Sequence, residues 1–178
     1  MTRYEPGTEE YEAVVYDLDG TLVHLAVEWD VVAREVEAAL EARGVRVADP
    51  DLWGMLERAG ETEHEAAVEG VIAAHERRGA RESRRLPFAD ALPHDVPVAV
   101  CSLNCEAACR IALEVHDLDA HVDAVVGRDS VATKKPHPEP LLTAVEALGT
   151  TPERSLFVGD SERDEVTAER AGTAFRYV

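Results

Sequence analysis

The chain has 178 residues, of which 36 are Asp or Glu and 18 are Lys or Arg, so its formal net charge is -18. A balance this acidic argues against nucleic acid or an anionic membrane as a partner, because binding a polyanion requires a basic surface. No apolar stretch is long enough to cross a bilayer, and the first residues lack the basic start and apolar centre of a secretory signal. We therefore expect a cytoplasmic protein.

Lysine is scarce, since Lys134 and Lys135 are the only two and arginine supplies the other basic charges. The acids are spread through helical segments and 46% of the residues are apolar, so disorder is a poor explanation of the charge. Excess Asp and Glu with little lysine resembles proteins of organisms that keep molar salt in the cytoplasm, where surface repulsion is screened. The composition predicts a halophilic protein.

The first predicted strand is the apolar run at residues 13–16, which ends in Asp17, Asp19, Gly20 and Thr21. An apolar run of this length that stops at turn residues is typical of a buried strand. In so acidic a chain, the two carboxylates could be ordinary turn residues. The elements that follow have to decide between that interpretation and an active site.

Residues 24–85 hold no convincing strand and instead predict helices. Three segments have apolar residues at helical spacing and end in glycine, a common C-cap: residues 28–44, 49–60 and 61–79. We therefore expect a small all-helical cap inserted after the first strand. Trp29 and Trp53 could face a crevice from this segment, although packing is the favoured role of both.

The rest of the chain alternates between strand and helix patterns. Short apolar runs predict strands at residues 96–102, 122–127, 155–160 and 173–178, with helices at 105–118 and 139–149. Strands separated by such helices imply right-handed crossovers and a mainly parallel sheet covered on both faces. The predicted fold is α/β, with residues 1–23 and 86–178 as a Rossmann-like core and residues 24–85 as the cap.

The three cysteines are Cys101, Cys105 and Cys109. A spacing of four places Cys105 and Cys109 on one face of a helix, where a soft metal could bind. No CxxC pair supports zinc, so we favour small buried apolar side chains.

Polar side chains stand where the predicted strands end. Ser102 follows the second strand, Asp160 follows the fourth with Asp164 one turn later, and Lys135 precedes the helix before the fourth strand. In open α/β sheets ligands gather at the carboxyl ends of the strands, so these side chains are expected to meet Asp17 in one crevice. A carboxylate that attacks a phosphate needs a divalent cation and a positive side chain to offset repulsion, and Mg²⁺ prefers oxygen ligands.

Four short motifs occur in a fixed order: Asp17-Leu18-Asp19-Gly20-Thr21, Ser102, Lys135-Pro136, and Gly159-Asp160-Ser161-Glu162-Arg163-Asp164. With them the chain resembles the haloacid dehalogenase superfamily of phosphotransferases. The helical insertion after the first motif resembles the phosphoglycolate phosphatase-like group, whose small caps close over small phosphorylated metabolites. Because the second acid of the first motif is intact, the resemblance favours phosphate esters over carbon-halogen bonds.

The resemblance also implies roles for single residues. Asp17 is expected to be the nucleophile that forms an aspartyl-phosphate, and Asp19 the general acid and base. Ser102 and Lys135 are expected to bind the substrate phosphate. Four residues are expected to hold Mg²⁺: Asp17, Asp19 through its backbone carbonyl, Asp160 and Asp164. Asp164 would bind the metal either directly or through a water.

Alternatives remain for several of these residues. Asp160 and Ser161 could simply cap the following helix. Lys134 could replace Lys135. Many relatives have asparagine directly after the serine of the second motif, whereas here Asn104 comes two residues later, so any role for it is doubtful.

The leading prediction is a Mg²⁺-dependent phosphatase of a small organic phosphate ester. A sugar phosphomutase of the same superfamily would use the same nucleophile and acid but return the phosphoryl group to its substrate. A non-catalytic regulator that binds a phosphorylated ligand is the third alternative. Nothing in the pattern indicates the oligomeric state or the identity of the substrate.

Overall fold

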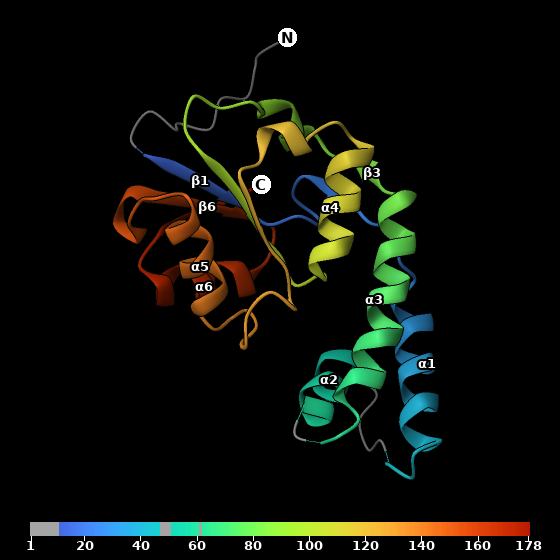
Figure 1. Cartoon of the computed structure of the whole chain (residues 1–178). Coiled ribbons are helices and arrows are strands. Elements are labelled where there is room, and N and C mark those ends of the chain that lie inside the picture. Colours follow the sequence, from blue (N-terminus) through green and yellow to red (C-terminus); the bar gives the residue numbers. More distant parts are fainter. Residues whose placement is uncertain (1–10, 47–50, 61) are drawn as a thin grey trace.

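A computed structural model of the chain describes residues 11–46, 51–60 and 62–178. The core is a five-stranded sheet in the order β5-β4-β1-β6-β7 (Figure 1). Its strands are β1 Ala13–Tyr16, β4 Val98–Cys101, β5 Ala124–Val126, β6 Ser155–Gly159 and β7 Ala174–Tyr177. All neighbouring pairs are parallel, so the predicted α/β class and each of the predicted strands are confirmed.

Helices cover both faces of this sheet (Figure 1). Val14 and Tyr16 of β1 share an apolar cluster with α4 (Glu106–Val115), whereas Val15 shares one with α5 (Glu139–Ala147) and α6 (Glu162–Ala171). Because successive residues of a strand point to opposite faces, a strand buried on both sides becomes a continuous apolar run. Short 3-10 helices complete the connections: η2 Pro87–Ala91, η3 Asp119–His121 and η4 Pro152–Arg154.

Three helices between the first two core strands form a unit that we call the helical insert. They are α1 Trp29–Glu41, α2 Leu52–Gly60 and α3 Glu65–Arg81. The insert has its own apolar cluster, which includes Val32, Met55 and Ile72, all fully buried. The insert extends from one end of the core. The C-terminal part of α3, which leads back to the core, packs against α4 (Figure 1). The predicted start of the second insert helix, at residues 49 and 50, lies outside the described residues.

The insert joins the core through a structure that the sequence pattern missed. The expectation of no strand in residues 24–85 is wrong in one detail, because β2 (Val23–His24) pairs antiparallel with β3 (Arg84–Arg85). A strand of two residues is too short to produce an alternating pattern. It forms here because the two connections between core and insert run side by side.

All three cysteines are free and buried. Cys101 lies on β4, Cys105 precedes α4, and Cys109 lies on the face of α4 that packs against the sheet. This confirms the interpretation of these residues as small apolar side chains of the core.

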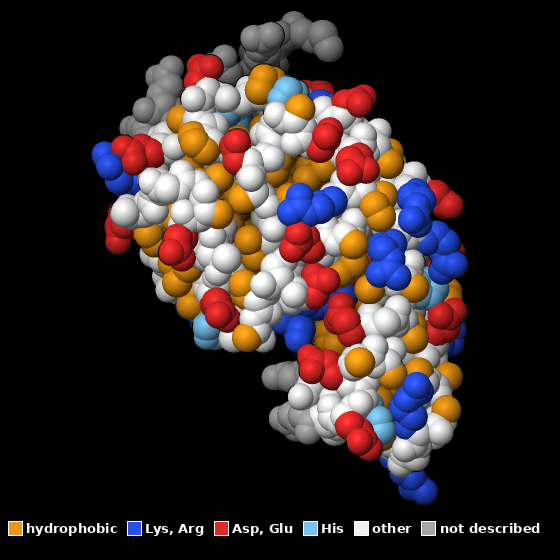
Figure 2. All heavy atoms as spheres, in the orientation of Figure 1, with side chains coloured by type: hydrophobic (Ala, Val, Ile, Leu, Met, Phe, Trp, Pro, Cys, Tyr) orange, Lys and Arg blue, Asp and Glu red, His pale blue; other side chains and the backbone are white. Residues whose placement is uncertain are grey.

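Acidic side chains are scattered over the surface of both core and insert, and a hollow lies between the two on one side (Figure 2). A solvated acidic shell of this kind agrees with the spread of Asp and Glu along the sequence. Within the described part of the chain, no helix has the length and hydrophobicity that crossing a bilayer requires.

Candidate active site

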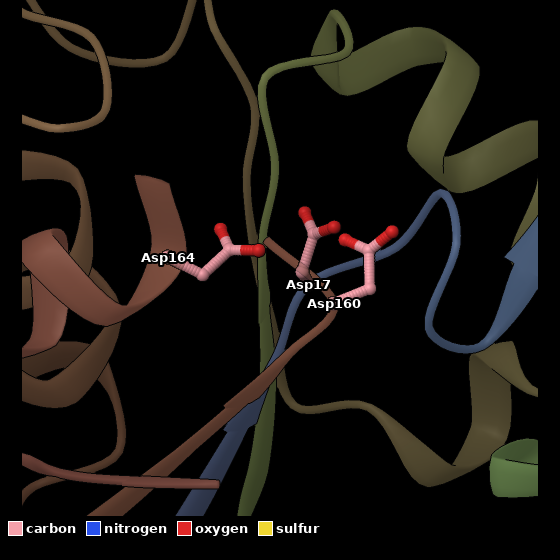
Figure 3. Close-up of side chains that lie close together, drawn as sticks. All are labelled: Asp17, Asp160 and Asp164. Carbon is pink, nitrogen blue, oxygen red and sulfur yellow. The ribbon is translucent and has the colours of Figure 1, made fainter. Parts of the chain in front are cut away.

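Three carboxylates meet at the carboxyl ends of the central strands (Figure 3). Asp17 follows β1, Asp160 follows β6, and Asp164 lies in the first turn of α6, with one oxygen of each within 4.8 Å of the others. β1 and β6 are parallel neighbours in which Tyr16 pairs with Val158, so the residues after both strands come close together. Asp17 and Asp164 are buried, whereas Asp160 is exposed.

Lys135 is the cation of this cluster. Its Nζ donates to Asp17 Oδ1 at 2.9 Å, to Asp164 Oδ1 at 2.5 Å and to the carbonyl of Cys101 at 3.2 Å. Burial by itself lowers the pKa of Lys135, but the two carboxylates outweigh burial and hold that pKa above its usual value. Lys134 lies away from the cluster, 3.7 Å from Glu65, so Lys135 is the lysine at the carboxylates.

Burial dominates the electrostatics of Asp17. Burial raises the pKa of Asp17 to about 7, although the ammonium of Lys135 opposes this shift. The ammonium of Lys135 therefore does not fully offset the effect of burial on the Asp17 carboxylate. A divalent cation beside Asp17 would favour the ionised carboxylate, so the donor set fits a metal ion with oxygen ligands.

The turn after β1 places Asp19 in the wall of the cavity that Asp17 also lines. Asp19 Oδ1 accepts a hydrogen bond of 2.8 Å from the backbone N–H of Leu25, which ties the carboxylate to the connection with the insert. Burial raises the pKa of Asp19. Gly20 adopts a φ of +86°, and a Cβ at this position would lie 2.0 Å from Asp160 Oδ2, so only glycine allows the turn to pass so close to Asp160.

The helix-cap alternative is confirmed for Ser161 but not for Asp160. Ser161 is the N-cap of α6: its Oγ accepts from the N–H of Asp164 at 3.3 Å, and Asp164 Oδ2 accepts from the Ser161 hydroxyl at 2.7 Å. Asp164 thus caps the helix with one oxygen and binds Lys135 with the other. The carboxylate of Asp160 takes no part in this cap.

Ser102 lies buried at the end of β4, on the same side as Asp17. Its Oγ donates to Asn104 Oδ1 and accepts from the Asn104 N–H, both at 3.1 Å. Asn104 Nδ2 in turn donates to Glu76 Oε1 at 3.3 Å. Asn104 therefore orients the serine from two residues away, an arrangement that sequence reasoning left in doubt.

A buried ion network connects the helical insert to Ser102 and was not predicted. Arg128, which follows β5, donates to Glu76 Oε1 at 2.5 Å and Oε2 at 2.9 Å, and to Glu69 Oε1 at 2.6 Å. The side chains of Arg128 and Glu76 are 0% exposed. The one sequence signal was that Glu69 and Glu76 stand seven residues apart, which places them near one face of a helix.

All six predicted site residues line one cavity of about 440 Å³, which we call the first cavity: Asp17, Asp19, Ser102, Lys135, Asp160 and Asp164. The insert contributes Trp29, Asp30 and Trp53 to its wall. The two tryptophan rings lie 6.0 Å apart and also pack against the apolar cluster of the insert. Packing and cavity lining are thus combined in both residues.

Comparison with known proteins identifies relatives along most of the chain. Residues 89–178 match the family model described as haloacid dehalogenase-like hydrolase. A phosphoglycolate phosphatase of Cereibacter sphaeroides (strain ATCC 17029) is 32% identical over 183 residues, which cover 91% of this chain and 82% of the relative. The phosphoglycolate phosphatase of Aquifex aeolicus is 29% identical over 175 residues, covering 90% of this chain and 81% of the relative.

Among solved structures, CbbY from Rhodobacter sphaeroides in complex with phosphate has a similar fold. The TM-score is 0.70 at 19% identity, over 94% of this chain and 85% of that one. At this identity the likeness concerns the fold.

Proposed function

The chain belongs to the haloacid dehalogenase-like hydrolases and is a phosphoric monoester hydrolase, and we propose that Asp17 is its nucleophile. The observation that carries the proposal is the position of Lys135 between Asp17 and Asp164, with Asp160 next to them. A lysine there offsets negative charge on both the nucleophile and an approaching phosphate.

We propose Mg²⁺ as the metal, held by oxygens of Asp17, Asp160 and the Asp19 backbone. Asp164 already uses one oxygen for Lys135 and the other for Ser161, so we assign its contact with the metal to a bound water. When bound, the cation would reduce the repulsion between the Asp17 carboxylate and the substrate phosphate.

In the first proposed step, a carboxylate oxygen of Asp17 attacks phosphorus and the bond to the ester oxygen breaks, while Asp19 gives that oxygen a proton. In the second step Asp19 takes a proton from water, which attacks the aspartyl-phosphate and releases phosphate. Burial raises the pKa of Asp19, which favours its work as an acid, and its bond from Leu25 N–H leaves the other oxygen available for the proton.

Ser102 and Lys135 are the proposed phosphate ligands. The Ser102 hydroxyl now donates to Asn104 and would exchange this partner for a phosphate oxygen. The buried network of Glu76 and Arg128 holds Asn104 in place and therefore keeps the serine aimed at the cavity.

We propose that residues 24–85 act as a cap over the site. Trp29 and Trp53 bring apolar surface to the wall of the first cavity, which would exclude water from the reacting phosphate. No specific observation favours a sugar phosphomutase or a non-catalytic regulator. The relatives named above are phosphatases, and each side chain expected for the catalytic set lines the first cavity.

The test is phosphate release from p-nitrophenyl phosphate and a panel of metabolite phosphates that includes phosphoglycolate, with Mg²⁺ and in molar KCl because of the acidic composition. Asp17→Asn should abolish turnover. Asp119→Asn, which alters an exposed carboxylate in η3, serves as the matched control and should retain full activity. Equal activity of Asp17→Asn and the wild type would refute the assignment of the nucleophile.

A further inference from the structure

A second cavity adjoins the first, and Trp53 lines both. It measures about 700 Å³, and the two cavities share four lining residues: Asp51, Trp53, Leu103 and Lys135. Lys135 therefore lines both cavities, whereas none of the proposed catalytic carboxylates lines the second one. It is large enough for a chemical group that is attached to the reacting phosphate.

The charges of the two cavities differ. Five further carboxylates line the first cavity besides Asp51, and Lys135 is its one Lys or Arg side chain among the described residues. The second cavity is lined by three cationic side chains, those of Lys134, Lys135 and Arg163. Only two described carboxylates line it, those of Asp51 and Glu65. Both lysines of the chain thus line this cavity, in a protein whose net charge is -18.

Arg163 is the cation best placed to bind a ligand there. It lies in the first turn of α6, is half-buried, and its guanidinium carbon stands 5.9 Å from the centre of the Trp53 ring. No described side chain forms an ion pair with it, whereas Arg128, at the same distance from that ring, is held by Glu69 and Glu76. A guanidinium that lies over an aromatic ring and has no ion pair keeps its N–H groups available for a carboxylate or phosphate.

We propose that the second cavity binds a second anionic group of the substrate, a carboxylate or a second phosphate, through Arg163 with help from Lys134. This inference rests on the proposed function, since the group to be cleaved must lie at Asp17. Lys134 lies 3.7 Å from Glu65, a loose pair that an anionic ligand can replace. In the first cavity the same group would meet Asp30 and the catalytic acids instead.

The test compares three esters of similar size: phosphoglycolate with a carboxylate, ethanediol bisphosphate with a second phosphate, and hydroxyethyl phosphate with a neutral end. The measured quantity is the preference, the kcat/KM of each anionic ester divided by that of the neutral one. Loss of a charge-assisted hydrogen bond weakens binding by about tenfold or more. Arg163→Gln should therefore lower the preference at least tenfold, mainly through KM, and Arg163→Lys should retain part of it.

Arg43→Gln, which removes an exposed arginine of the insert, is the matched control and should leave the preference unchanged. Whichever anionic ester loses more in Arg163→Gln identifies the second group as carboxylate or phosphate. A preference within twofold of wild type for both esters would overturn the inference while leaving the proposed function intact.

A binding measurement separates this result from any effect on catalysis. In the Asp17→Asn background, calorimetric titration should show that Arg163→Gln weakens binding of the preferred anionic ester at least tenfold more than that of hydroxyethyl phosphate. Equal weakening of both esters would also overturn the inference. Failure of the proposed function would be seen differently, as turnover that survives Asp17→Asn.

Discussion

Replacement of Arg128 by methionine tests whether the buried network stabilises the contact between insert and core. Methionine retains much of the arginine stem but removes the charge, so Glu76 would remain fully buried without its cation. Breaking a buried ion pair from one side costs about 3–5 kcal/mol. Glu76 keeps the hydrogen bonds from Asn104 Nδ2 and Cys105 N–H, so we expect the lower end, about 3 kcal/mol. This is a large part of the 5–15 kcal/mol typical of a domain, about a fifth or more.

The assay is equilibrium unfolding in urea, followed by fluorescence of Trp29 and Trp53 in the insert and by circular dichroism of the whole chain. With a urea slope of about 2 kcal/mol per molar, a loss of about 3 kcal/mol lowers the midpoint by about 1.5 M. Arg110→Met is the matched control, because Arg110 forms an exposed i,i+4 pair with Glu106 and should cost less than about 1 kcal/mol.

A double variant distinguishes an unpaired charge from lost packing. If the buried charge of Glu76 causes the loss, Arg128→Met combined with Glu76→Gln should be more stable than Arg128→Met alone, because the neutral amide removes the charge while its oxygen can still accept a hydrogen bond from Asn104 or Cys105. A loss below about 1 kcal/mol in Arg128→Met, or a double variant less stable than the single one, would refute this reasoning.

Three further predictions concern the site and the core. Lys135→Met should lower kcat for p-nitrophenyl phosphate on the order of a hundredfold or more, because Asp17 and the phosphate lose their cation; a loss under tenfold contradicts the proposed role. Gly20→Ala should raise the Mg²⁺ concentration needed for half-maximal activity, since the added Cβ would displace Asp160, and an unchanged Mg²⁺ titration would count against Asp160 as a ligand. Burial lowers the pKa of His94, so the folded state binds fewer protons than the unfolded state and its stability should fall as the pH drops below about 6.5. His94→Gln should show a smaller fall in urea midpoint between pH 7.5 and 5.5 than the wild type, and parallel curves would exclude this contribution.

The sequence by itself determined the sheet and the place of the candidate site residues at its edge. Buried parallel strands are continuous apolar runs, so all five strands of the core sheet could be recognised from local pattern. The separate pair of β2 and β3 could not, because each has only two residues. Because the carboxyl ends of parallel strands share one edge, Asp17 and Asp160 could be expected to meet although 143 positions separate them in the printed sequence.

Only the tertiary structure decided how the side chains around that edge are paired. No local pattern pairs Glu76 of α3 with Arg128, which follows β5. The packing of α3 against α4 accompanies their burial as a pair, and Asn104 connects Glu76 to Ser102. The same holds for the choice of Lys135 over its neighbour and for the position of Arg163 on Trp53. Periodicity records which face of an element is buried, whereas the partner of a buried charge depends on which other element packs there.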